Sequence, residues 1–181
     1  MARLTLFFIS LFALFFLCAR LVPTVGASTL DDPPIADIIN TLEADGLISH
    51  IHITISVYDF KLDTLVNNRV TLDFDAKNPV ATELTLDRAT VTGTLNDTVW
   101  VTFDQHFNQP VVVPSLNTTN SGPIPNASLT QGAIPFLDII PLGILDLNAD
   151  LFLHAGSMDI PIQITGLKQT SVPTTYDLLL G

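Results

Sequence analysis

The stretch Val70–Leu95, VTLDFDAKNPVATELTLDRATVTGTL, decides the fold class of this 181-residue chain. Apolar and polar residues alternate on both sides of an Asn78-Pro79 pair. A period of two places successive side chains on opposite faces of a β-strand, so each half predicts a strand with one buried face. Because proline has no backbone N–H for a sheet ladder, the pair predicts the end of the first strand.

The same alternation recurs along the chain. It marks Ile51–Val57, Val99–Phe103, Leu145–Leu153 and Met158–Ile164, and a short apolar segment, PVVVP, stands between two prolines. Residues 115–132, SLNTTNSGPIPNASLTQG, are polar and rich in glycine and proline, which predicts a loop. Several short strands separated by turn signals, without alternating helices, predict an antiparallel sandwich or barrel.

One helix is predicted ahead of the strands, within residues 31–46, DDPPIADIINTLEADG. The aspartates can cap it and the prolines suit its first turn. Its apolar residues recur at helical spacing and Gly46 ends it. A helix of about three turns with one apolar stripe is typical of an element that covers one end of a larger core.

Residues 1–27 have the pattern of a secretory signal peptide. Arg3 precedes an apolar run from Leu4 to Cys18, and a small residue, Ala27, marks the predicted cleavage site. An uncleaved membrane anchor is the alternative, but the run is shorter than the roughly 20 residues that span hydrocarbon. Cleavage removes the one cysteine, so the mature domain is held by its core alone. The predicted location is extracellular, with the lumen of the secretory pathway or a vacuole as the alternative.

The charge of the chain excludes some partners. It has 7 basic and 18 acidic residues, a formal net charge of −11. Nucleic acid requires a basic surface, and anionic lipid attracts basic segments, so neither is a predicted partner. Three Asn-x-Ser/Thr patterns, at Asn96, Asn117 and Asn126, predict N-glycosylation if the source is eukaryotic.

The order of these segments resembles the folded late-embryogenesis-abundant domain, also called the water-stress and hypersensitive-response domain. The resemblance rests on the strand that ends in Asn78-Pro79, on ATELTLDRATVTGTL after it, on QPVVVP, and on the closing hairpin LDLNADLFLHAGSMDIPIQITGL. It covers about residues 51–176. It implies an immunoglobulin-like sandwich and a binding or protective module without catalytic residues, with lipid or membrane contact in some members. Similar domains occur in secreted and vacuolar fungal proteins.

These observations together predict an all-β protein. We expect an antiparallel immunoglobulin-like or fibronectin-like β-sandwich of seven to eight strands with a short N-terminal helix. The domain boundaries are a signal peptide at 1–27, a helical segment at 28–47 and the β-sandwich at 48–181.

Two pairs of side chains are candidates for metal or acid–base chemistry. His50 and His52 lie two residues apart on one strand, so both imidazoles share a face, as Zn²⁺ or Cu²⁺ would need. Asp73 and Asp75 form a similar pair, suited to Ca²⁺ or to proton transfer. Since the sequence shows no further converging ligands, a solvated strand face is the favoured interpretation of each pair, and no metal or cofactor is predicted.

Nucleophilic catalysis has no sequence support. The chain contains no Gly-x-Ser-x-Gly turn and no glycine-rich phosphate loop, and its one cysteine lies in the predicted signal peptide. The chain is therefore predicted not to be an enzyme.

The segment AIPFLDIIPLGIL, residues 133–145, is the strongest candidate for a ligand site. It is apolar, holds two prolines and carries one charge, Asp138. Buried, it would cover the open end of the core; exposed, it would be an apolar patch of the kind that marks a lipid, membrane or partner site. Trp100, out of phase with its apolar neighbours, is predicted to face outward. It would be covered by a neighbouring loop or lie on the flank of the second sheet; the alternative is an exposed ring that stacks on a sugar or sits at a membrane interface. The candidate ligand-binding residues are Trp100, Ile134, Phe136, Leu137, Ile139, Ile140 and Leu142.

We therefore predict a secreted, non-catalytic module that binds an apolar or lipid ligand, or a membrane surface, at the end covered by residues 134–145. The alternative is a glycosylated structural or interaction protein of the cell wall or extracellular matrix without a ligand pocket. No protein partner can be named from the sequence.

Overall fold

The computed structural model describes residues 35–57, 66–156 and 160–180, so the predicted signal peptide lies outside the described residues. The described elements are α2 (Ile35–Asp45), β1 (Ile48–Val57), β2 (Arg69–Lys77), β3 (Leu84–Leu95), β4 (Thr98–Val113), β5 (Thr118–Asn120), β6 (Ile124–Leu129), α4 (Ala133–Phe136), the 3₁₀ turn η1 (Ile140–Leu142), β7 (Ile144–Ala155) and β8 (Ile160–Leu180).

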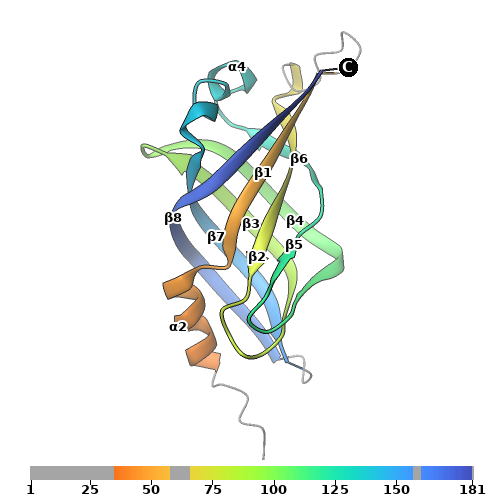
Figure 1. The fold of residues 1–181 in the computed structure, drawn as a ribbon, viewed down its shortest axis with the longest axis vertical. Coiled ribbons are helices and arrows are strands. Elements are labelled where there is room, and N and C mark those ends of the chain that lie inside the picture. The colour runs from red at the N-terminus through yellow and green to blue at the C-terminus, as the bar shows by residue number, and fades with distance from the viewer. Residues whose placement is uncertain (1–34, 58–65, 157–159, 181) are drawn as a thin grey trace, which may run out of the picture. The chain divides into compact units, whose positions relative to one another are not determined.

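Seven of the strands form a closed barrel (Figure 1). The hydrogen-bonded order is β1-β8-β7-β3-β4-β6-β2, and β2 pairs with β1 to complete the ring, while the short β5 pairs with β2. The predicted immunoglobulin-like sandwich is therefore wrong. A sandwich and a barrel give the same alternating strand pattern, because both bury every second residue. They differ in which strands pair: here β1 pairs with β8 on one edge and with β2 on the other, which closes the sheet.

One pairing in the ring is parallel. β1 pairs with β8 in parallel from Ile51↔Thr174 to Val57↔Leu180, whereas β1 and β2 are antiparallel. A purely antiparallel architecture was predicted, and the sequence shows no sign of this contact because its two strands are far apart along the chain.

β-Bulges give β8 the curvature that closure requires. Gly166 and Ser171 have positive φ angles of 70° and 54°, and the register with β7 shifts at both positions. Two aspartates of β7 hold these bulges: Asp150 accepts a hydrogen bond from the Gly166 N–H and Asp146 accepts one from the Ser171 N–H, each at 2.7 Å. Beyond the alternation that ends at Ile164, the chain therefore continues in the same bent strand to Leu180.

The predicted loop at residues 115–132 contains two strands. β5 pairs with the end of β2, and β6 fills the gap between β2 and β4. Ile124, Ala127 and Leu129 of β6 are buried in the core. Asn126, at φ 64°, lies where the β2–β6 register shifts, which breaks the simple alternation and hides the strand among glycine, proline and asparagine.

Asn78 ends β2 as predicted and is itself buried. Its side-chain amide donates hydrogen bonds to the carbonyl oxygens of Thr82, Val113 and Pro114, at 2.8, 3.0 and 3.2 Å. Its Oδ1 accepts one from the Val80 N–H at 3.0 Å. One polar side chain thus joins the turn after β2 to the end of β4.

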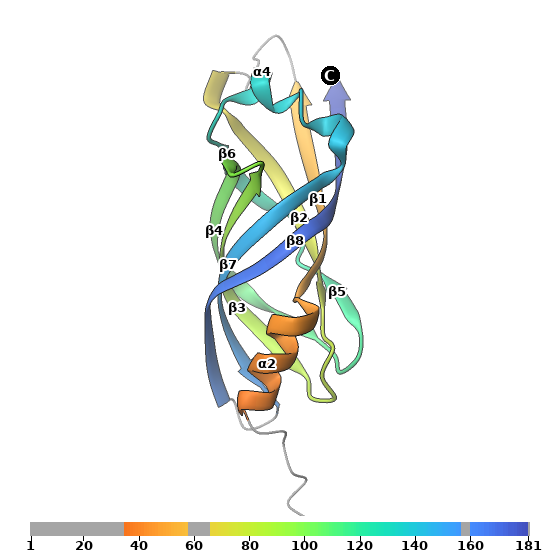
Figure 2. The same ribbon diagram turned by 90° about the vertical axis from the view of Figure 1, so that its left-hand side faces the viewer.

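The barrel interior is a continuous apolar core, covered at each end by a helical segment. α2, the predicted helix, buries Ile38 and Leu42 and ends at Gly46, where φ is 75°. Figures 1 and 2 show α2 and α4 at opposite ends of the barrel. Among the described residues, no helix is both long and apolar enough to cross a membrane.

Candidate functional site at the capped end of the barrel

The segment Ala133–Ile144, here called the cap, lies across the end of the barrel opposite α2 (Figure 2). It consists of α4, η1 and the residues that join them to β7. The proline positions explain its form: Pro135 lies in α4 and Pro141 in η1, and neither could donate in a sheet ladder. The cap has two sides, one buried and one exposed.

The buried side closes the barrel. Phe136 is 0% exposed, and its ring lies 6.4 Å from the Trp100 ring of β4 and 5.8 Å from the Tyr176 ring of β8. Ala133 and Ile139 are also buried, and Ile140 is partly buried against the core. Of the predicted ligand residues, Phe136, Ile139, Ile140 and Trp100 therefore belong to the closure itself.

Hydrogen bonds tether the cap at both of its ends. The Ala133 N–H donates to Oδ1 of Asn68, just before β2, at 3.0 Å. Just before the cap, the Gln131 amide donates to the Val99 carbonyl at 3.0 Å. After η1, the Thr174 N–H of β8 donates to the Gly143 carbonyl at 2.8 Å. The cap is thus attached to β2, β4 and β8.

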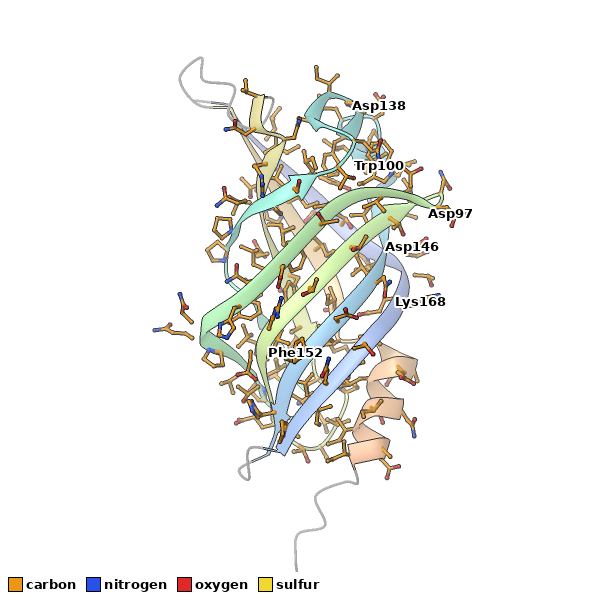
Figure 3. The ribbon with its side chains drawn as sticks, turned by 180° about the vertical axis from the view of Figure 1, so that it is seen from behind. Asp97, Trp100, Asp138, Asp146, Phe152 and Lys168 are labelled. Atoms are coloured by element: carbon orange, nitrogen blue, oxygen red, sulfur yellow. The ribbon has the colours of Figure 1, made fainter. Side chains whose placement is uncertain are left out.

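The exposed side of the cap is apolar. Ile134 is 71% exposed, Leu137 42% and Leu142 54%, and Ile144 at the start of β7 is also exposed. Asp138 is the one charged residue in the cap, and Figure 3 shows it at the same end as Trp100. Three of the predicted ligand residues, Ile134, Leu137 and Leu142, therefore face away from the core.

A β-bulge determines the position of Trp100. Opposite β3, Gly93 pairs with Val101 but Thr94 pairs with Val99, so Trp100 is an extra residue in β4. Its ring therefore packs against the core under the cap, although alternation predicted an outward ring. The sequence also predicted that a neighbouring segment covers Trp100, and the ring of Phe136 in the cap does so.

Two polar groups under the cap have no hydrogen-bond partner among the described residues, Nε1 of Trp100 and the hydroxyl of Tyr176. Burial raises the pKa of Tyr176 to about 12. Desolvation disfavours the phenolate, which is the charged form. The end of the barrel is thus an apolar environment that keeps the Tyr176 hydroxyl protonated and leaves the Trp100 N–H without a partner among the described residues.

The Tyr176 pKa predicts a loss of stability at alkaline pH. In the unfolded chain a tyrosine ionises near pH 10, whereas folded Tyr176 stays neutral to about pH 12. The free energy of unfolding is therefore expected to fall as pH rises from 10 to 12. Urea denaturation of wild type and Tyr176→Phe across this range measures it: the variant should show a smaller fall, and equal falls would contradict the assignment.

The other predicted site residues lie away from the cap. His50 and His52 of β1, and Asp73 and Asp75 of β2, are half-buried on the outer face of the barrel. Asn96, Asn117 and Asn126 are exposed, at the β3–β4 turn, before β5 and within β6. Their exposure is compatible with glycosylation, which stays a prediction.

An ion pair lies on the outer face of β3 and β4. Both nitrogens Nε and Nη2 of Arg88 donate to the Asp104 carboxylate, at 2.8 and 2.6 Å. These bonds lower the pKa of Asp104 and raise that of Arg88. Both side chains are exposed and Arg88 also lies 5.7 Å from the Phe152 ring, so the pair has the character of a surface contact.

A shallow groove of about 440 Å³ marks the place where β4 and β6 separate. The two strands pair only at Val101↔Leu129 and Thr102↔Ser128. Beyond these pairs Phe103 and Ile124 form part of its lining, with Arg69 beside them. Arg69 is engaged with the Asn126 carbonyl at 2.7 Å, so the groove offers no free cation from this residue.

Sequence reasoning missed the residues that complete the cap. Asn68 lies just before β2 with a φ of 52°, which fits a turn, but its side chain also holds Ala133. Tyr176 was not among the candidate residues. Neither carries a local signal, because each acts through a residue distant in the chain.

The comparisons with known proteins add little to this geometry. No model of a known protein family matches the chain, and no curated protein does. Among solved structures, the crystal structure of a protein from Archaeoglobus fulgidus is similar at 10% identity, over 58% of this chain and 87% of that chain, with a TM-score of 0.32. A likeness this distant carries no argument, and the resemblance to late-embryogenesis-abundant domains stays a prediction.

Proposed function

We propose that this chain is a secreted, non-catalytic β-barrel module that attaches to a lipid surface through the exposed side of its cap. The observation that carries the proposal is the exposure of Ile134, Leu137 and Leu142 on a segment whose other side is anchored in the core. Secretion rests on the signal peptide pattern in residues 1–27.

Because the cap has one buried and one exposed side, it favours binding to a lipid surface over binding of a ligand inside the barrel. Phe136 fills the space between Trp100 and Tyr176, so a ligand inside the barrel would have to displace it. The outer side needs no rearrangement to contact a lipid surface. Figure 1 shows that β8 runs to the end of the barrel where α4 lies. Leu178, near the end of β8, is 56% exposed and adds to the apolar surface there.

Charge selects the kind of lipid. The cap carries Asp138 and no lysine or arginine, and the whole chain has a net charge of −11. Anionic headgroups would repel such a surface, whereas zwitterionic headgroups would not. The proposed occupant is therefore a zwitterionic membrane, entered by apolar side chains and without dependence on basic residues.

Vesicle flotation tests the proposal. The protein purified from a eukaryotic host expressing all 181 residues should float with phosphatidylcholine vesicles, and less with vesicles rich in phosphatidylserine. Replacing Ile134, Leu137 and Leu142 together by serine should weaken binding roughly 100-fold, at about 1 kcal/mol for each partly inserted side chain.

The matched control is Val112→Ser with Leu116→Ser, which removes exposed apolar side chains outside the cap. This variant should bind like the wild type. Failure of the wild type to float, or equal losses in the two variants, would refute attachment through the cap.

A further inference from the structure

The cap is hydrogen-bonded to the barrel only at its two ends. One tether is at Ala133 and the other at Gly143. Between them, the hydrogen bonds formed by segment 134–142 among the described residues all run to neighbours within residues 132–143. The middle of the cap is therefore held on the barrel by apolar packing alone, through its buried side chains.

A glycine with positive φ stands at each end of this segment. Gly132, just before the cap, has φ 87° and ψ 162°, and Gly143 has φ 63° and ψ 19°. The first conformation is essentially restricted to glycine, and the second suits glycine better than other residues. Glycine also reaches a wide range of other backbone angles. Segment 134–142 can therefore swing away from the barrel without a change in β6 or β7.

Two hydrogen-bond donors lie unused beneath this segment. Nε1 of Trp100 and the hydroxyl of Tyr176 are buried and have no partner among the described residues. Both rings pack against the Phe136 ring, at centroid distances of 6.4 and 5.8 Å. Leaving a buried donor unpaired costs free energy, so the closed cap carries a penalty that an oxygen acceptor would relieve. Departure of Phe136 would leave a space bordered by both rings.

A lipid surface changes the balance that keeps the cap closed. In water, the hydrophobic effect favours the closed arrangement because it buries Phe136 and Ile139. Against hydrocarbon this driving force is lost, since lipid chains are as apolar as the core. Tryptophan and tyrosine are enriched at the membrane interface, where the apolar ring and the polar tip are both accommodated. A membrane therefore stabilises the open arrangement relative to the closed one.

We propose that the cap is a lid that swings open on the membrane, and that Trp100 and Tyr176 then donate hydrogen bonds to ester carbonyl oxygens of a phospholipid. These oxygens lie between the headgroups and the hydrocarbon, the depth at which both rings are favoured. In solution, Phe136 fills this lipid site. The inference rests on the lipid attachment proposed above and adds a specific site beneath the lid.

Flotation with two phosphatidylcholines tests the site. One has ester-linked chains, and the other has ether-linked chains and lacks the carbonyl oxygens. Wild-type protein from a eukaryotic host expressing all 181 residues should float with both, but bind the ether lipid about 10-fold more weakly, as the loss of two ordinary hydrogen bonds predicts. Trp100→Phe with Tyr176→Phe should bind both lipids equally. Tyr176→Phe alone, which keeps one donor, should show an intermediate preference, and circular dichroism checks that each variant is folded.

Hydrogen exchange of the Trp100 indole N–H in D₂O, followed by NMR, measures opening of the lid without lipid. Gly132→Ala strains the closed cap, because alanine rarely adopts φ 87°, so this exchange should become about 10-fold faster. The matched control is Gly122→Ala, outside the cap. Gly122 also has a positive φ, of 70°, and a Cβ there would meet nothing within 4 Å. This control should leave the indole exchange rate unchanged.

The outcomes separate the lid from the attachment itself. Flotation with equal affinity for the ester and ether lipids would overturn the site beneath the lid and leave attachment through the exposed side of the cap intact. An ester preference that persists in Trp100→Phe with Tyr176→Phe would do the same. Equal indole exchange in Gly132→Ala and the wild type would show that the cap does not open at this glycine, which also contradicts the proposal. Failure of the wild type to float with either lipid would refute both proposals.

Discussion

Replacing Asn78 by aspartate is expected to lower the free energy of unfolding by about 3–5 kcal/mol, a large part of the stability of a domain. The wild-type amide donates to three carbonyl oxygens and is 1% exposed. A carboxylate cannot donate, so the same oxygens would face a buried negative charge instead. Urea denaturation followed by circular dichroism measures the loss.

The pH dependence of Asn78→Asp separates this cause from a simple loss of packing. Burial would raise the pKa of the introduced carboxyl, because the charged form is disfavoured. The deficit should therefore be smallest near pH 4, where the carboxyl is protonated and can donate, and should grow as pH rises. Asn108→Asp, at an exposed asparagine of β4, is the control and should change stability by less than about 0.5 kcal/mol. If Asn78→Asp also lowered the free energy of unfolding by less than about 0.5 kcal/mol, the role described for the Asn78 amide would be contradicted.

Truncating Phe136 to alanine is expected to cost about 3–5 kcal/mol, the range for a buried aromatic side chain. The ring is fully buried between Trp100 and Tyr176, and its removal leaves a cavity under the cap. Because Trp100 is the one tryptophan of the chain, its fluorescence reports on the cap directly. Its emission should shift to longer wavelength and become accessible to iodide quenching.

Phe152→Ala provides the comparison. Phe152 of β7 is half-buried on the outer face, where the Arg88 guanidinium lies over its ring. Its truncation should cost about 1 kcal/mol or less and leave the tryptophan emission unchanged. If Phe136→Ala were as mild as Phe152→Ala in both measurements, the cap would not be held by Phe136.

The sequence predicted the faces of most strands but not their arrangement. Alternation correctly assigned Ile51, Ile53 and Ile55 to the core and His50 and His52 to the outer face, because strand geometry alone determines which face a residue takes. It could not choose between a sandwich and a barrel on these grounds. That choice depends on which strand edges pair, and backbone pairing leaves little trace in side-chain types.

Local irregularities account for the remaining differences. The bulge at Trp100 reverses the expected orientation of its ring, and the irregularity at Asn126 conceals β6 within a segment that resembles a loop. At the candidate site, the sequence identified the apolar segment and its covering position. It could not predict that Phe136 is buried while Ile134 and Leu137 are exposed, because the residues of a segment interrupted by prolines follow no single period.

The parallel contact between β1 and β8 has a consequence for biosynthesis. Leu47, just before β1, and Gln169 of β8 are in hydrogen-bond contact although 122 residues separate them. At a translation rate of about 5–20 residues per second, one edge of β1 waits roughly 6–24 s for its partner to emerge from the ribosome. Until then the nascent chain presents an unpaired β-edge that could recruit another polypeptide. Chaperone protection during this interval is therefore expected to raise the yield of folded protein.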